Sequence, residues 1–113
     1  MKYNQVNWDK YPFISNTCNV KEYYEWVEDN GCLYGLRDHY LGWIESHNKG
    51  QGAKVINKLV DELGYITLAP VPSAENYYLN LGFVWQYDFD TASDFMIKVR
   101  DDYKNMIDNS LYF

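Results

Sequence analysis

The chain has 113 residues, of which 47% are hydrophobic and 19% aromatic, so it supports one compact domain spanning residues 1–113 and argues against wholesale disorder. Its formal charge of −6 argues against binding to a nucleic-acid backbone, because such affinity is built mainly from lysine and arginine contacts. The same charge favours cationic partners such as amines or basic protein surfaces, although it is equally explained by solubility alone.

The two cysteines, Cys18 and Cys32, have no CxxC motif or His/Cys cluster around them. They therefore indicate reduced thiols rather than a metal site. The first residues, Met1–Gln5, lack the apolar region of a signal peptide, and no apolar run approaches the ~20 residues needed to span a bilayer. We therefore expect a soluble cytoplasmic protein with no metal and no membrane partner.

In the N-terminal part we expect a short strand around Tyr11–Ile14, followed by an amphipathic helix. Asn19 is in position to cap that helix, with Glu22 at the capping-box position, and Asn30-Gly31 is a natural stop. The apolar side chains of the predicted helix recur at helical spacing: Val20, Tyr23, Tyr24 and Val27.

The middle of the chain predicts a hairpin and then a helix. Two apolar-aromatic runs, Cys32–Leu36 and Tyr40–Ser46, are separated by Arg37-Asp38-His39, which is typical of a hairpin connection. A polar, glycine-bearing stretch follows, and after it the pattern predicts a helix over 53–63 that Gly64 ends. One buried face of this helix is marked by Ile56, Leu59, Val60 and Leu63.

In the C-terminal part, Tyr65–Ala69 is expected to form a buried strand, and Ser73 to cap a short helix that Gly82 ends. Alternating residues then predict two strands, over 83–89 and 95–99, joined by the loop 90–94. The inner face of the short helix is expected to hold Ala74, Tyr77, Tyr78 and Leu81, and the inner face of the first strand Phe83, Trp85, Tyr87 and Phe89. A terminal helix is expected over 101–111.

The expected order of elements is α-β-β-α-β-α-β-β. The unit formed by strand 40–46, helix 53–63 and strand 65–69 is a crossover, so its two strands should be parallel and its connection right-handed. The outer strand pairs should be antiparallel. The expected fold class is therefore a mixed α/β (α+β) sheet rather than a doubly wound one.

The stretch between strand 40–46 and helix 53–63 suits the binding of a pyrophosphate. Glycines there let the main chain curl tightly, and the unpaired N–H groups of the first helical turn lie at the positive end of the helix dipole. The residues concerned are Asn48, Lys49, Gly50, Gln51, Gly52 and Ala53. They match neither a Walker loop nor a dinucleotide fingerprint, and taken alone they also fit a plain structural turn.

Two motifs in order carry a resemblance to a known family. His47-Asn48-Lys49-Gly50-Gln51-Gly52 occupies the window of a Gln/Arg-x-x-Gly-x-Gly/Ala motif, and the segment 74–83, Ala-Glu-Asn-Tyr-Tyr-Leu-Asn-Leu-Gly-Phe, fits an Ala-x-x-aromatic-Tyr-x-x-x-Gly-Phe motif. In this order and at this separation, over about residues 32–100, they resemble the GNAT superfamily of N-acetyltransferases, some compact members of which are encoded by phages.

The resemblance implies acetyl-CoA as co-substrate and no metal. It implies that the strands before the turn and after the helix splay apart, and that the backbone around Ile44 pairs with the pantetheine arm. It further implies that the amides of Asn48–Ala53 hold the pyrophosphate, with Lys49 adding positive charge or remaining a solvated side chain.

The resemblance also implies catalytic roles. Tyr78 matches the tyrosine that protonates the leaving thiolate, although it also fits core packing. Glu45, at the end of its strand, is a candidate for the base that accepts the amine proton. His39 or Asp38 acting through water, or a water chain without any base, are the alternatives.

Three features depart from the family pattern. His47 replaces the usual Gln or Arg, the stretch before it lacks the common Val-x-Pro approach, and the N-terminal region is abbreviated. A shortened acceptor wall suggests either a macromolecular acceptor or a homodimer that completes the site. The expected function is acetyl transfer to a small amine or a protein lysine. The alternative is a non-catalytic, acidic GNAT-like protein that binds and inhibits a basic or DNA-binding host protein.

Overall fold

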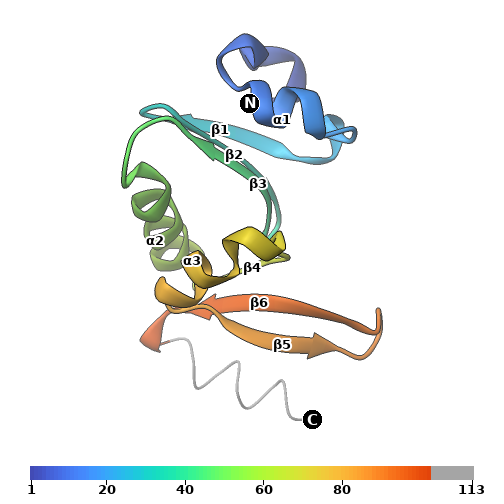
Figure 1. The fold of residues 1–113 in the computed structure, drawn as a ribbon, viewed down its shortest axis with the longest axis vertical. Helices are drawn as coiled ribbons and strands as arrows, with labels where there is room; N and C mark the ends of the chain where they lie inside the picture. The colour runs from blue at the N-terminus through green and yellow to red at the C-terminus, as the bar shows by residue number, and fades with distance from the viewer. Residues whose placement is uncertain (103–113) are drawn as a thin grey trace. The chain divides into compact units, whose positions relative to one another are not determined.

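The computed structural model describes residues 1–102, and these fall into two compact units, Met1–Val55 and the chain from Ile56 onward. Each unit contains α-helical segments and three strands that pair antiparallel with one another (Figure 1). The chain is therefore of the α+β class, as expected in outline. The parallel pairing and splay of strands 40–46 and 65–69 stay predictions.

The sheet of the first unit contains β1 (Glu25–Asp29), β2 (Cys32–Arg37) and β3 (Tyr40–Ser46). Strand β2 lies between the other two and pairs antiparallel with both. Asp38, in the turn between β2 and β3, has a φ of 55°. The hairpin predicted over 32–46 is confirmed.

The helix predicted over 19–30 is wrong. A 3₁₀ helix covers only Lys21–Tyr23, no side chain caps it, and β1 follows. Asn30 and Gly31, with φ of 49° and 81°, form the two-residue connection between β1 and β2 rather than a helix stop. Two positive φ values in an Asn-Gly pair are the geometry that joins antiparallel strands tightly, so pairing with β2 overrides the helical spacing.

The strand expected around Tyr11–Ile14 is also wrong, because helix α1 spans Pro12–Thr17. Pro12 occupies the first turn, where its missing N–H costs nothing. Tyr11, Ile14 and Cys18 are almost fully buried, and their spacing of three and four residues is helical rather than alternating.

The core of the first unit forms between α1 and the sheet, with Trp26 as its largest fully buried side chain. The Trp26 ring meets Trp8 edge-on at a centroid distance of 5.0 Å, and its indole N–H donates to the Lys21 carbonyl at 2.8 Å. Gly35, opposite Trp26 in the sheet, leaves the room for this ring, since a Cβ there would lie 2.8 Å from it. The remaining members of this core are Tyr11, Ile14, Cys18 and Leu33.

Helix α2 (Gln51–Leu63) begins in the first unit and continues into the second, and Gly64, with a φ of 90°, ends it. Its start lies two residues earlier than the predicted 53–63. Of its predicted apolar face, Ile56, Leu59 and Val60 are buried and Leu63 is only half-buried, while Val55 is buried in addition. The spacing of these side chains is the helical one, so periodicity was a sufficient signal here.

The second unit continues with β4 (Tyr65–Leu68), α3 (Glu75–Asn80), β5 (Val84–Asp88) and β6 (Ser93–Val99). Strand β6 lies between β4 and β5 and pairs antiparallel with both. A 3₁₀ turn, Pro72–Ala74, leads into α3, so the predicted cap by Ser73 does not form.

One further expectation differs in the second unit, and another cannot be compared with the structure. Phe83 is buried, but Trp85, Tyr87 and Phe89 are exposed rather than inward-facing. The terminal helix predicted over 101–111 lies outside the described residues from position 103 onward. Within residues 1–102, no helix combines the length and apolar character needed to cross a bilayer.

Candidate functional site

The turn between β3 and α2 curls as the glycine pattern predicted. Gly50 has a φ of 81°, in the left-handed region that favours glycine, and a Cβ built on it would meet no atom within 4 Å. The side of the turn at Gly50 is therefore open, whereas Gly52 is buried in the first turn of α2. Lys49 and Lys54, on either side of the two glycines, are both exposed.

Three hydrogen bonds fasten this turn to the connection between β1 and β2. The His47 backbone N–H donates to the Gly31 carbonyl at 2.9 Å. The Asn48 side-chain amide donates to the Asn30 carbonyl, and the Gln51 side-chain amide donates to the Asp29 carbonyl at 3.2 Å. The turn is thus held at both ends by backbone acceptors of a neighbouring hairpin, which fixes its shape before any ligand arrives.

Some N–H groups at the start of α2 are used within the turn and others are left over. The Gln51 N–H donates to Asn48 and the Lys54 N–H to Gly50, at 3.1 and 3.2 Å. Among the hydrogen bonds of the described residues, none uses the N–H groups of Gly52 or Ala53. Unpaired amides of a first helical turn suit an anionic group such as a phosphate.

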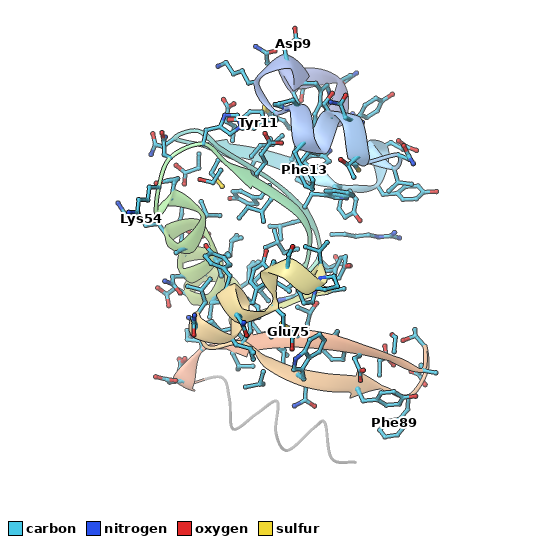
Figure 2. The ribbon with its side chains drawn as sticks, viewed as in Figure 1. Asp9, Tyr11, Phe13, Lys54, Glu75 and Phe89 are labelled. Atoms are coloured by element: carbon cyan, nitrogen blue, oxygen red, sulfur yellow. The ribbon has the colours of Figure 1, made fainter. Side chains whose placement is uncertain are left out.

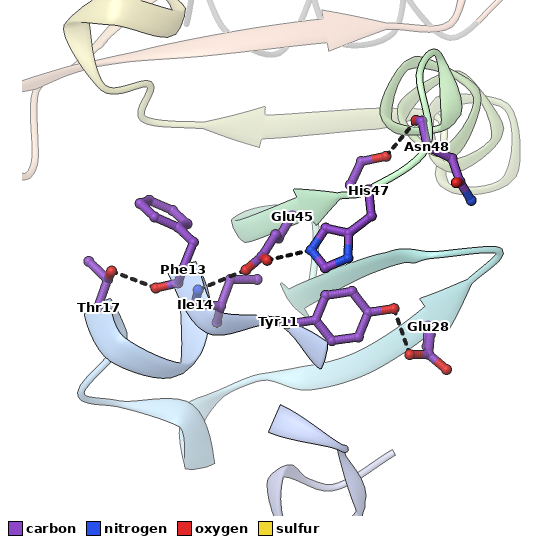
Figure 3. A network of polar contacts seen from close by, with 9 residues as sticks. Tyr11, Phe13, Ile14, Thr17, Glu28, Glu45, His47 and Asn48 are labelled. Atoms are coloured by element: carbon purple, nitrogen blue, oxygen red, sulfur yellow. Dashed lines mark hydrogen bonds and ion pairs between the residues drawn. The ribbon is translucent and has the colours of Figure 1, made fainter. Parts of the chain in front are cut away.

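Glu45 lies at the end of β3, and its side chain is only 10% exposed. One carboxylate oxygen accepts the Ile14 backbone N–H at 2.9 Å, and the other meets His47 Nε2 at 2.7 Å (Figure 3). Ile14 is the third residue of α1, so Glu45 supplies from a distant strand the acceptor that an N-cap side chain normally provides. Both carboxylate oxygens of this predicted base are therefore engaged by the protein.

The network extends from His47 to Tyr11 and Glu28. The Tyr11 ring lies against the His47 imidazole at a centroid distance of 5.0 Å, and the Tyr11 hydroxyl donates to Glu28 at 2.6 Å (Figure 3). Burial, reinforced by the Glu28 carboxylate, raises the pKa of Tyr11 above its ordinary value. Sequence reasoning missed Tyr11 and Glu28, because a misassigned strand and a misassigned helix placed them in the wrong elements.

Tyr78 lies in α3, which belongs to the second unit, whereas the turn before α2 belongs to the first. Its side chain is 9% exposed, and its ring meets Phe83 edge-on at a centroid distance of 5.5 Å. Desolvation by burial raises the pKa of Tyr78, with Tyr77 as a smaller contribution. The hydroxyl therefore holds its proton throughout the neutral range.

The other predicted residues are placed as follows. Ile44 is half-buried in β3 opposite Tyr34 of β2. Asp38 and His39, the alternative bases, lie in the turn between β2 and β3, at the opposite end of β3 from Glu45. Cys32 is buried, which raises the pKa of its thiol to about 11. Within residues 1–102, no group of three His, Cys, Asp or Glu side chains could hold a metal ion.

Comparisons with protein-family models, with curated proteins and with solved structures found no match to this chain.

Proposed function

We propose that the protein is a GNAT-like N-acyltransferase that transfers the acetyl group of acetyl-CoA to an amine. The observation that carries the proposal is the turn before α2, where Gly50 is left-handed and open and the N–H groups of Gly52 and Ala53 have no partner among the described residues. The reaction breaks the C–S bond of the thioester and forms a C–N bond, while the amine loses a proton and the thiolate gains one.

The residues of the turn would hold the pyrophosphate. The N–H groups of Gly52 and Ala53 supply donors at the positive end of α2, and the exposed Lys49 and Lys54 supply positive charge beside them. Side-chain clamps from Asn48 and Gln51 to the β1–β2 connection keep the loop from rearranging. The backbone around Ile44 would pair with the pantetheine arm.

Proton transfer is assigned to Tyr78 and water. Tyr78 holds its proton at neutral pH, as a donor to the leaving thiolate must. Glu45 is already bonded to the Ile14 N–H and to His47, so we give it the role of fixing α1 and His47 rather than that of the base. The amine proton would then leave through water, one of the alternatives that the sequence left open.

The acceptor is an amine-bearing small molecule or a protein lysine. The net charge of −6 attracts amines over long distances. The alternative function is binding of a basic or DNA-binding partner without catalysis. It needs no acetyl-CoA, so a measurement of acetyl-CoA binding distinguishes it from acyl transfer.

Acetyl-CoA at about a hundredfold excess over its dissociation constant is expected to stabilise the protein by ~2.7 kcal/mol, a rise in Tm of roughly 10 °C. Replacing Gly50 by alanine places a Cβ in the open side of the turn, so we expect acetyl-CoA to bind at least about tenfold more weakly, a loss of ~1.4 kcal/mol. Calorimetric titration and thermal unfolding give both quantities.

Gly64→Ala is the matched control, because Gly64 has a similar positive φ of 90° but lies at the other end of α2. Both variants carry a backbone strain of about 1 kcal/mol, and only Gly50→Ala should weaken binding. Tyr78→Phe should lower kcat and leave the affinity for acetyl-CoA unchanged. A wild-type protein with no thermal shift would contradict acyl transfer and leave the binding function.

A further inference from the structure

The hairpin of β5 and β6 exposes three aromatic side chains that the acyl-transfer proposal does not use. Trp85, Tyr87 and Phe89 are 41%, 47% and 87% exposed. Trp85 and Tyr87 alternate along β5, and Phe89 follows at the same spacing in the loop, so we call these three side chains the aromatic row. Figure 2 shows Phe89 in the loop at the end of the hairpin, projecting away from the strands.

The aromatic row has a defined geometry. Tyr87 and Phe89 meet edge-on, with ring centroids 4.9 Å apart and planes at 77°. The Trp85 indole N–H donates to the Glu75 carboxylate of α3 at 3.1 Å, which fixes the orientation of its ring. The Asp88 carboxylate accepts the N–H of Asp90 at 2.9 Å, so the loop that carries Phe89 is itself bonded. The rings are thus exposed, yet held in place.

Two carboxylates lie beside the aromatic row. Asp94 of β6 is directly opposite Tyr87, so the two side chains share one face of the sheet. Glu75 reaches Trp85 from α3. From Leu59 to Ile97 the sequence contains no lysine, arginine or histidine, while it contains these acidic residues: Asp61, Glu62, Glu75, Asp88, Asp90 and Asp94. The aromatic row therefore lies beside two carboxylates, those of Asp94 and Glu75.

We propose that the aromatic row binds arginine or lysine side chains of a basic polypeptide segment. Aromatic faces attract cations through their quadrupole, and neighbouring carboxylates add charge and hydrogen-bond acceptors for a guanidinium. A second copy of this chain does not fit, because two such faces would bring the same carboxylates together. The inference does not depend on acyl transfer, since none of its residues has a role in the proposed reaction.

The test uses the full chain and a short fluorescein-labelled peptide of alternating arginine and glycine, followed by fluorescence anisotropy. The same peptide with citrulline in place of arginine keeps the shape and loses the charge. We expect the arginine peptide to bind, more weakly as salt is raised, and the citrulline peptide not to bind. Phe89→Ala and Tyr87→Ala should each weaken binding by about threefold, and the double variant by about tenfold.

Three further variants distinguish recognition of a cation from nonspecific apolar binding. Phe89→Tyr keeps a ring and should keep the affinity, whereas Phe89→Leu keeps apolar area without a π face and should weaken binding like Phe89→Ala. Phe13→Ala removes a comparably exposed ring, 55% accessible, from the first unit and should change nothing. Equal binding of the citrulline peptide, or unchanged binding by the double variant, would overturn the proposal. So would sedimentation showing a dimer that Phe89→Ala dissociates.

Discussion

Replacing Trp26 by alanine is expected to lower the free energy of unfolding by about 3–5 kcal/mol, the largest effect of any single change considered for this chain. Trp26 is 0% exposed and occupies the centre of the first unit. The substitution removes the ring that Trp8 meets edge-on and leaves a cavity that Gly35, having no side chain, does not fill. It also removes the donor to the Lys21 carbonyl.

Urea unfolding followed by far-UV circular dichroism measures this loss without relying on tryptophan fluorescence, which the substitution itself changes. Phe89→Ala is the control, because this ring is 87% exposed and its removal should alter stability by no more than about 0.5 kcal/mol. A Trp26→Ala protein as stable as the wild type would mean that the core of the first unit is wrongly described.

Replacing Glu45 by alanine is expected to cost about 2–3 kcal/mol of stability, because two charge-assisted contacts disappear together. The Ile14 N–H at the start of α1 loses its acceptor, and His47 loses its carboxylate partner. Glu45→Gln retains an acceptor for Ile14 and an amide for His47, so it should cost only about 1 kcal/mol. Glu22, an exposed glutamate of the same unit, is the matched control for Ala substitution.

The two Glu45 variants also distinguish a positioning residue from a base. A residue that fixes α1 and His47 loses stability in the alanine variant and recovers most of it with glutamine, while kcat with an amine acceptor follows the fraction folded. If Glu45 were the catalytic base, the glutamine variant would instead lose kcat while it stays folded, since glutamine cannot accept the proton. Parallel measurement of urea unfolding and of kcat for both variants decides between them.

The sequence predicts well those elements whose own pattern agrees with their packing. Helix α2 was anticipated from four apolar side chains at helical spacing, all but one of which proved buried, together with Val55. The hairpin β2–β3 was anticipated from two apolar runs on either side of Asp38. Here local propensity and tertiary contacts point the same way, so periodicity alone is enough.

The prediction fails where a distant partner decides the structure. The segment before Asn30-Gly31 reads as an amphipathic helix, yet pairing with β2 makes it strand β1. The exposure of Trp85 and Tyr87 likewise contradicts the usual inference from alternating aromatic residues. In both cases the missing information is the identity of the neighbouring element, which periodicity within one segment does not contain.

In the candidate site, too, the local features could be predicted from the sequence and the long-range contacts could not. The tight turn at Gly50 was predictable, because a glycine between a strand and a helix marks a left-handed position. The clamps on that turn and the capping of α1 by Glu45 were not predictable, because they join residues 18 to 31 positions apart in the sequence. Side-chain roles that depend on such contacts become visible only in the folded chain.

Assigned amide NMR spectra during a titration with acetyl-CoA show whether the turn before α2 binds a diphosphate. We expect the largest saturable shifts at the N–H groups of Gly50, Gly52 and Ala53, because these amides would lie against the pyrophosphate. S-acetylpantetheine, which lacks that group, should leave them unchanged. If acetyl-CoA produced no saturable shift at these amides, or the same pattern as S-acetylpantetheine, the turn before α2 would not be a diphosphate site.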